Sequence, residues 1–204
     1  MISSKKELQF YLKADRMMNR GEFTPSLRAR IKSLFMPDYT MQWLSAMRHA
    51  SYYKTQLGGG LLYFKWLRKY KRLSMKLGFS IEPDVFGYGL VVPHYGTIVV
   101  GGSNRIGNYA VLHSSSCIVD RQSVIGDGLY LSVGAIISNH VVFGGNVTVG
   151  ANSTVNKSCP EGNVLLVGSP AAVKKESVAW FIRDGERFQK RVQEVESLRN
   201  SMML

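Results

Sequence analysis

The chain has few cysteines, no long apolar run and a shortage of acidic residues. Its two cysteines among 204 residues, Cys117 and Cys159, are too few and too isolated for a disulfide scaffold or a cluster of metal ligands. We therefore predict two reduced packing residues and no metal site. The N-terminus lacks the apolar segment of a secretory signal, and no apolar stretch approaches the ~20 residues that span a bilayer. We expect a cytoplasmic protein, with contact at the inner face of the membrane left open.

The shortage of acids leaves a formal net charge of +12, and this charge is unevenly distributed. Residues 1–78 hold sixteen Lys or Arg against four acids, whereas residues 79–173 hold three against five. Because no nucleic-acid recognition motif accompanies the basic residues, we expect no nucleic-acid partner. The pattern indicates three regions: a basic α-helical region over 1–78, a central domain over 79–173 and a terminal helix over 174–204.

The central region has an aliphatic or aromatic residue at every sixth position, with one extra residue after the third. These residues are Ile106, Leu112, Ile118, Ile125, Leu131, Ile137, Phe143, Val149 and Val155. A helix repeats at 3.6 residues and a strand at 2, so a period of six predicts short strands that turn a corner each time and stack into a solenoid. Carried backwards through Val100 and across a second one-residue shift, the period places Ile81, Gly87 and Pro93 at interior positions.

The period of six also predicts where two histidines lie relative to each other. His94 and His113 are nineteen residues apart, which is three hexapeptides plus one inserted residue. If three hexapeptides close one coil, the two imidazoles lie on the same edge of neighbouring coils, about one strand spacing of ~4.8 Å apart. A pair of histidines on one exposed edge is a candidate site, and two surface histidines without a task are the alternative.

Several segments resemble one family of enzymes. They are residues 87–100, with the string His94-Tyr-Gly-Thr-Ile-Val-Val100, and residues 105–113, 147–157 and 167–171. Together they resemble the left-handed β-helix hexapeptide-repeat acyltransferases, in particular the serine acetyltransferases and their capsular polysaccharide O-acetyltransferase relatives. The resemblance implies a mainly β fold, a left-handed parallel β-helix with helices before and after it. It also implies a cyclic homotrimer, because the acetyl donor in this family lies between neighbouring prisms.

The resemblance implies transfer of an acetyl group from acetyl-CoA to a hydroxyl, with no metal. An alcohol is a poor nucleophile at neutral pH, so a base must take its proton, and His94 is the candidate for that base. Residues expected to contact the acceptor are His113, Arg121 and Tyr95. Residues expected to lie along coenzyme A are Gly134, Ala135, Ala151, Gly168, Lys174 and Lys175. The carboxylate that orients His94 is left open among Glu82, Asp84 and Asp120.

Two departures from the family bear on the acceptor. Serine-specific members have an aspartate before the catalytic histidine, where this chain has Pro93, and a second histidine in a longer loop, where it has Gln122. We therefore expect a sugar hydroxyl of a surface polysaccharide, capsular or exopolysaccharide, as the acceptor. L-Serine, for cysteine biosynthesis, is the alternative enzyme function, and a non-catalytic β-helix scaffold is the third reading.

Two amphipathic segments flank the repeat. Residues 61–77 carry Leu62, Trp66, Tyr70, Leu73 and Leu77 at helical spacing among basic residues. Such a helix either lies on an anionic membrane or packs its stripe on its own solenoid or a neighbouring subunit. Towards the C-terminus, Phe181, Phe188, Val195 and Met202 recur at seven residues, which predicts a helix that needs a partner surface. We expect the segment around Phe188 to support contacts between subunits.

Overall fold

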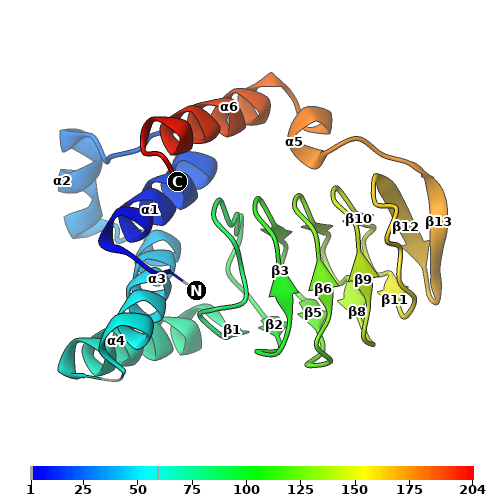
Figure 1. The fold of residues 1–204 in the computed structure, drawn as a ribbon, viewed down its shortest axis with the longest axis horizontal. Helices are drawn as coiled ribbons and strands as arrows, with labels where there is room; N and C mark the ends of the chain where they lie inside the picture. The colour runs from blue at the N-terminus through cyan, green and yellow to red at the C-terminus, as the bar shows by residue number, and fades with distance from the viewer. Residues whose placement is uncertain (1, 59) are drawn as a thin grey trace.

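The computed structural model describes residues 2–58 and 60–204, and it shows a β-solenoid with helices at one end and a helical segment along one side (Figure 1). The N-terminal helices are α1 (Lys5–Arg20), α2 (Leu27–Phe35), α3 (Tyr39–Leu57) and α4 (Leu61–Leu77). After the solenoid come α5 (Trp180–Arg183) and α6 (Glu186–Ser201). The predicted fold class, a parallel β-helix between an α-helical region and a terminal helix, is confirmed.

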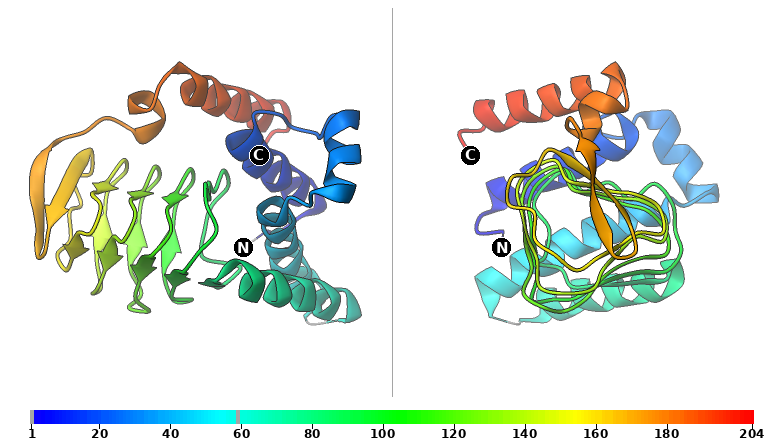
Figure 2. Two further views of the ribbon diagram at one scale, coloured as in Figure 1. Left: turned by 180° about the vertical axis from the view of Figure 1, so that it is seen from behind. Right: turned by 90° about the vertical axis from the view of Figure 1, so that its right-hand side faces the viewer.

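The solenoid has three sheets, and each coil contributes one strand or bridge to each sheet. The first sheet holds β1 (Phe79–Ile81), β2 (Ile98–Val100), β5 (Ser116–Ile118), β8 (Ile136–Ile137) and β11 (Thr154–Val155). The second holds β3 (Arg105–Ile106), β6 (Val124–Ile125) and β9 (Val142–Phe143). The third holds β4 (Val111–Leu112), β7 (Tyr130–Leu131), β10 (Thr148–Val149), β12 (Val164–Gly168) and β13 (Ala171–Glu176). Strands pair in parallel except at the β12–β13 hairpin. Viewed along the axis, the coils superpose on one closed outline (Figure 2, right).

The interior of the prism is filled by the residues that recur every six positions. All nine predicted members of that series, from Ile106 to Val155, are at most 4% exposed. The extra residue lies in the corner between β5 and β6, where Gln122 has a left-handed φ of 59°. An insertion at a corner lengthens the turn and leaves the stacked strands in register.

The first coil differs from the prediction. Its strand positions pair Ile81 with Val100 and bridge Phe86 to Ile106, so the interior residues are Phe86 and Val92 rather than Gly87 and Pro93. The physical reason is size, because Phe86 and Val92 fill the interior, whereas Gly87 has no side chain and Pro93 is exposed.

This shift lengthens the turn that carries His94. Paired residues are twenty positions apart before that turn, at Val91 and Val111, and eighteen apart after it, at Ile98 and Ser116. The turn is therefore two residues longer than the corresponding turn of the next coil. The added length allows His94 to stand out from the edge of the prism, where it is exposed.

Helices α3 and α4 close the open end of the solenoid. Tyr70, Leu73 and Leu77 of α4 are buried in the same core as Phe79 and the coil interiors, and Trp66 stacks on His49 of α3 with ring centroids 3.9 Å apart. From Trp66 to Leu77 the apolar stripe predicted in residues 61–77 therefore packs inside its own chain, which was one of the two alternatives. Leu62, at the start of the stripe, is 43% exposed, and so are the basic residues of α4.

A buried ion pair joins α1 and α3 to the first coil. The Asp15 carboxylate and the Arg48 guanidinium, each 1% exposed, lie 2.8 Å apart. Arg48 donates to the carbonyls of Phe86 (2.8 Å) and Gly87 (2.6 Å), and Leu90 N–H donates to Asp15 (3.1 Å). The side-chain amide of Asn19 on α1 donates to the Leu90 carbonyl (2.7 Å) and accepts from Val92 N–H (3.2 Å).

These side chains satisfy backbone groups on an edge of the sheet that has no further strand to pair with. Because Val92 lies two residues before His94, the same contacts fix the backbone that enters the His94 turn. The N-terminal helices therefore position the candidate base as well as closing the solenoid.

The C-terminal segment returns along the third sheet and packs on α1. Trp180 is 2% exposed and donates from Nε1 to the Tyr109 carbonyl (2.8 Å). Phe188 packs against Trp180 with ring centroids 5.2 Å apart, and Val195 is fully buried in a cluster with Phe10 of α1. The partner surface that the terminal helix was expected to need is thus found within the chain. Phe188 is half-buried there, and a contact of its segment with another subunit stays a prediction.

Among the helices described, none combines the length and the low charge needed to cross a bilayer.

Candidate active site

One edge of the prism carries most of the predicted site. It consists of the turns that join the third sheet to the first, residues 93–97, 113–115, 132–135 and 150–153, together with the β12–β13 turn at 168–170, which Gly168 N–H joins to Ser153 Oγ (3.0 Å), and we call it the histidine corner. Backbone hydrogen bonds connect successive turns, from Ser115 N to Thr97 O (2.6 Å) and from Gly134 N to Ser114 O (3.2 Å). This corner therefore presents one continuous strip of surface along the solenoid.

His94 and His113 lie together on this corner, as the spacing predicts. Their ring centroids are 6.3 Å apart with an angle of 42° between the ring planes. The separation is somewhat larger than the ~4.8 Å between strands because the His94 turn is longer than its neighbour. His94 is exposed and His113 is half-buried. The arrangement offers one imidazole that solvent and substrates can reach and a second, more fixed imidazole beside it.

Three residues that the sequence analysis missed complete the surroundings of His113. Tyr130 of β7 lies in the next coil, and its hydroxyl is 2.8 Å from His113 Nε2. The Arg183 guanidinium of α5 lies 4.5 Å from the Tyr130 ring centroid, and its Nη1 donates to Thr148 Oγ1 (3.0 Å). Asp184 accepts from Arg183 Nε at 2.7 Å. The returning C-terminal segment thus places a cation and a carboxylate beside the second histidine.

Burial determines the protonation states of His113 and Tyr130. Burial, and in second place the neighbouring His94, lower the pKa of His113 below the ordinary value of 6.5, while the Asp184 carboxylate acts in the opposite direction. Burial likewise raises the pKa of Tyr130, so its hydroxyl keeps its proton at neutral pH. His113 is therefore neutral near pH 7 and can accept a hydrogen bond from Tyr130.

We predict that a pH titration of the histidine ring signals by NMR places the pKa of His113 below 6.5. His94→Gln removes one of the two causes, so it should raise the pKa of His113 towards 6.5 without fully restoring it. His49, whose pKa is also lowered by burial but which lies on α3, is the internal control and should not respond. A His113 pKa at or above 6.5, or one unaffected by the substitution, would contradict this description of the site.

The other predicted acceptor residues divide into two groups. Tyr95 adjoins His94 on the histidine corner and is 76% exposed. Arg121 lies on a different corner, between β5 and β6, where its carbonyl is 3.1 Å from His140 Nδ1. Within one chain the structure does not bring Arg121 to the histidines, and its contact with an acceptor stays a prediction.

The three carboxylates considered as orienting groups for His94 are all engaged elsewhere. Asp84 accepts from Lys54 Nζ (3.0 Å), Glu82 from Lys71 Nζ (3.2 Å) and Asp120 from Ser103 N–H (2.7 Å). Within the described part of the chain, none of these three forms a hydrogen bond with His94. Asp184, at the C-terminal end of α5, is the carboxylate that acts on the pKa of His113.

Three of the six residues expected along coenzyme A form a row. Gly134, Ala151 and Gly168 fall on successive turns of the histidine corner, and Gly134 is required there, since it has φ +68° and an added Cβ would lie 2.2 Å from Asn152 Oδ1. Ala135 is fully buried, so its side chain belongs to the core and cannot contact a ligand.

Lys174 and Lys175 are exposed, but they lie on β13 rather than in the predicted terminal helix. Because β13 reverses direction after the turn at 168–170, these two ammonium groups lie beyond the end of the row of turns. Lys175 pairs with Leu165, and the register of the hairpin shifts between Leu165 and Leu166, next to these lysines.

Both cysteines are free, as predicted. Within residues 2–58 and 60–204, no group of three or more His, Cys, Asp or Glu side chains is arranged to hold a metal ion.

Comparison with known proteins places this geometry among acetyltransferase folds. The serine acetyltransferase of Neisseria gonorrhoeae superposes with a TM-score of 0.61 and 24% identity, covering 84% of this chain and 66% of that one. The serine acetyltransferase of Brucella abortus gives a TM-score of 0.62 at 21% identity, covering 84% and 69%. The chain therefore has the β-solenoid fold of the serine acetyltransferases, as the sequence resemblance implied.

Sequence relatives agree over shorter stretches. The serine acetyltransferase of Staphylococcus xylosus is 28% identical over 121 residues, which are 55% of this chain and 52% of that protein. The bifunctional protein GlmU of Synechococcus is 30% identical over 108 residues, 50% of this chain and 24% of that protein. The chain thus matches about half the length of the first relative and a quarter of the second. A scan against known family models finds no match.

Proposed function

We propose that this chain is an O-acetyltransferase that uses acetyl-CoA as donor and His94 as general base. The observation that carries the proposal is the pairing of an exposed and a half-buried imidazole on one edge of a solenoid of this fold. A solved serine acetyltransferase with 20% identity to this chain is a complex with CoA, which supports the choice of donor. The extended row of turns at the histidine corner suits a long, flexible donor.

The proposed reaction requires one proton shuttle. His94 takes the proton from the acceptor hydroxyl as the oxygen attacks the thioester carbonyl, and a tetrahedral intermediate forms. When the carbon–sulfur bond breaks, the departing thiolate takes that proton from the His94 imidazolium. The products are an O-acetyl ester and free coenzyme A thiol, and the histidine is restored. General-base catalysis of this kind contributes about 10² to 10⁴ in rate.

His113 is proposed to hold the reacting groups in place. A Tyr130 hydroxyl that donates to Nε2 leaves the proton of the neutral ring on Nδ1. That N–H becomes a fixed donor for a ligand oxygen, and the packing of Arg183 and Trp180 on Tyr130 holds the arrangement rigid. A preoriented donor of this kind is the group that stabilises developing negative charge on a carbonyl oxygen.

For the acceptor, the comparisons favour the alternative over the reading preferred from sequence. The reported relatives are mostly serine acetyltransferases, so we propose a small hydroxy amino acid such as L-serine as the first candidate. Arg183 and Asp184 support it, because a guanidinium and a carboxylate beside His113 match the two charges of a zwitterion. A sugar hydroxyl stays the second candidate, favoured by Pro93 and Gln122, which stand where serine-specific members have other residues.

The proposal includes a cyclic homotrimer in the cytoplasm. In one chain the histidine corner is an open edge with His94 and Tyr95 exposed, and a second prism against it would complete a groove for the donor. Such an arrangement would also allow Arg121 of a neighbouring subunit to approach the acceptor. Lys174 and Lys175 are proposed to contact the phosphates of coenzyme A electrostatically.

The acceptor can be tested by acetyl-CoA consumption across L-serine, nucleotide sugars and short capsular oligosaccharides. We expect saturable turnover with L-serine, and we expect Arg183→Gln to lower its kcat/KM at least about tenfold through loss of a charged contact. Arg187→Gln, an exposed arginine on α6, is the matched control and should leave the kinetics unchanged. Slow, unsaturable turnover of serine together with fast acetylation of a saccharide would instead establish the second candidate.

A further inference from the structure

Helix α2 presents an apolar face that nothing in the chain covers. None of its nine residues is buried. Its exposed apolar residues, with Met36 at its end, are Leu27 (73%), Ile31 (52%), Leu34 (78%), Phe35 (83%) and Met36 (68%). The spacing of 27, 31, 34 and 35 places these side chains along one side of the helix, and we call this set the apolar ridge. A contiguous exposed patch of this kind marks an interaction surface.

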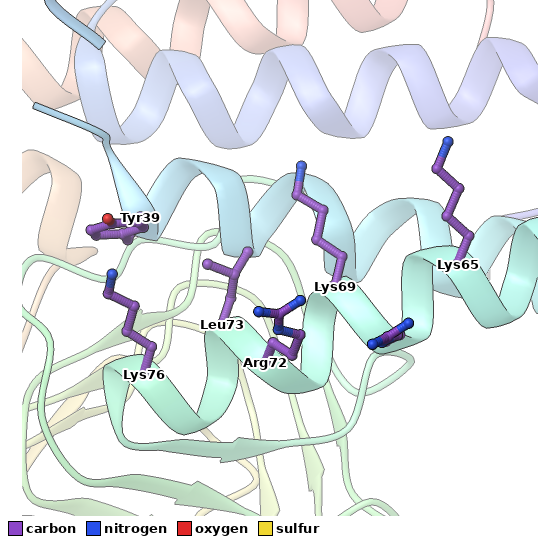
Figure 3. A pocket seen from close by; sticks show the side chains of 7 residues that line it. Tyr39, Lys65, Lys69, Arg72, Leu73 and Lys76 are labelled. Atoms are coloured by element: carbon purple, nitrogen blue, oxygen red, sulfur yellow. The ribbon is translucent and has the colours of Figure 1, made fainter. Parts of the chain in front are cut away.

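A basic groove lies at the same end of the molecule. It is a hollow of about 510 Å³ beside α4, lined by Tyr39, Leu73 and five cations, Lys65, Arg68, Lys69, Arg72 and Lys76 (Figure 3). No acidic residue lines it, and none of the five cations forms an ion pair with another described residue. Five unpaired charges in one hollow repel one another, so the surface favours an anionic partner.

The apolar ridge and the basic groove are neighbours. A second hollow of about 580 Å³ lies between α2 and the groove, and its lining includes Met36 of the apolar ridge, Arg30 and Lys32 from the other side of α2, and Lys69 from the groove. Both lie at the end of the molecule remote from the β12–β13 hairpin (Figure 1). Apolar side chains that project from a short helix, next to a field of Lys and Arg, are the combination that binds a membrane interface.

We propose that this surface docks the protein on an anionic lipid bilayer. The apolar ridge enters the boundary between head groups and acyl chains, and the basic groove and the cations of α2 contact anionic head groups. The proposal differs from the membrane contact considered for residues 61–77, because the apolar part comes from α2, whereas Tyr70, Leu73 and Leu77 of α4 stay in the core. It does not depend on the acetyl-transfer reaction.

A second copy of the chain is the competing occupant, and charge argues against it. A symmetric contact would bring the same patch of both copies together, and thus the basic groove of one close to that of the other. The nearby acids offer no compensation, because Glu22 pairs with Arg16 and Asp38 with Arg20 within the chain. A bilayer with negative lipids has no such conflict.

Flotation of the full-length protein with vesicles tests the proposal. We expect binding to vesicles containing about one third phosphatidylglycerol, little binding to pure phosphatidylcholine, and loss of binding as ionic strength rises from about 0.05 to about 0.5 M. The double variant Leu34→Ser, Phe35→Ser removes the tip of the apolar ridge, and Arg68→Gln, Arg72→Gln reduces the charge of the groove. Each should weaken binding at least about tenfold.

Matched controls separate this surface from general effects of charge and polarity. Met203→Ser removes an equally exposed apolar side chain, and Arg187→Gln, Lys190→Gln removes two exposed charges on α6, and both should bind vesicles as the wild type does. Equal loss in the test and control variants, or no binding to anionic vesicles, overturns the proposal. A lower sedimentation coefficient of the Leu34→Ser, Phe35→Ser variant in the absence of lipid would assign the ridge to a second copy instead.

Discussion

Replacement of His94 by alanine is expected to lower acetyl transfer at least about a hundredfold, the lower end of the range for general-base catalysis. His94 is exposed at the edge of the prism and lies outside the buried ring of aliphatic residues, so its removal costs the core nothing. We therefore expect an unchanged unfolding transition and unchanged binding of coenzyme A. Initial rates of thiol release at saturating acceptor, with calorimetric binding of coenzyme A on the same preparation, measure both quantities.

His140→Ala is the matched control for this substitution. His140 is also an exposed histidine at a corner of the solenoid, but it lies beside Arg121 rather than His113. Its replacement should leave thiol release within the error of the wild type. Near-normal turnover of the His94 variant, or equal losses in both variants, would remove His94 from the proposed mechanism.

Replacement of Arg48 by methionine is expected to destabilise the fold by about 3–5 kcal/mol, because it leaves the Asp15 carboxylate buried without its partner. The two groups are each 1% exposed, and the guanidinium also serves the carbonyls of Phe86 and Gly87. Asp15→Asn combined with Arg48→Met removes the unpaired buried charge, and the amide oxygen of the new asparagine can still accept from Leu90 N–H. The double variant should therefore recover much of the lost stability.

Urea unfolding of the four proteins of this cycle measures the effect and the coupling. Lys71→Met is the control, since Lys71 and Glu82 form an exposed pair at 3.2 Å and such pairs contribute about 0–1 kcal/mol. An Arg48→Met variant no less stable than Lys71→Met would show that the buried pair does not hold the helices to the first coil.

The period of six predicted the solenoid because each coil must bury one residue per side, and that requirement is visible in a single sequence. It failed in the first coil because counting by six ignores side-chain size. Phe86 and Val92 fill the interior there, and the turn of His94 is two residues longer than the corresponding turn of the next coil. A longer turn at a corner of a solenoid costs little free energy. Interior positions that are counted across several corners are therefore predicted less accurately.

The histidine pair was predictable for the same reason as the core, since both depend on register along the coils. Tyr130 precedes the interior residue Leu131 and so had to point outward, a signal that could have identified it. Arg183 and Asp184 reach the site only because the chain reverses after β13 and packs Trp180 on the third sheet. No local pattern in the sequence encodes such a return.

The amphipathic segments show the same limit. The stripe of residues 61–77 is long and aromatic, and the open end of the solenoid covers it from Trp66 to Leu77. Helix α2 is shorter and drew no prediction, yet its apolar side chains stay exposed, because the chain that follows it places α3 rather than α2 against the core. Amphipathicity identifies a face that needs a partner, and only the tertiary structure shows which faces have found one.

The measurement that tests the central claim most directly is mass spectrometry of the acceptor after incubation of the wild-type protein with acetyl-CoA, together with titration of the free thiol released. If the histidine corner is an acetyl-transfer site, L-serine or a saccharide gains one acetyl group per thiol released, and His94→Ala abolishes both signals. No acetylated product with any acceptor, from a folded protein that does not bind coenzyme A, would contradict the account and leave the solenoid as a scaffold.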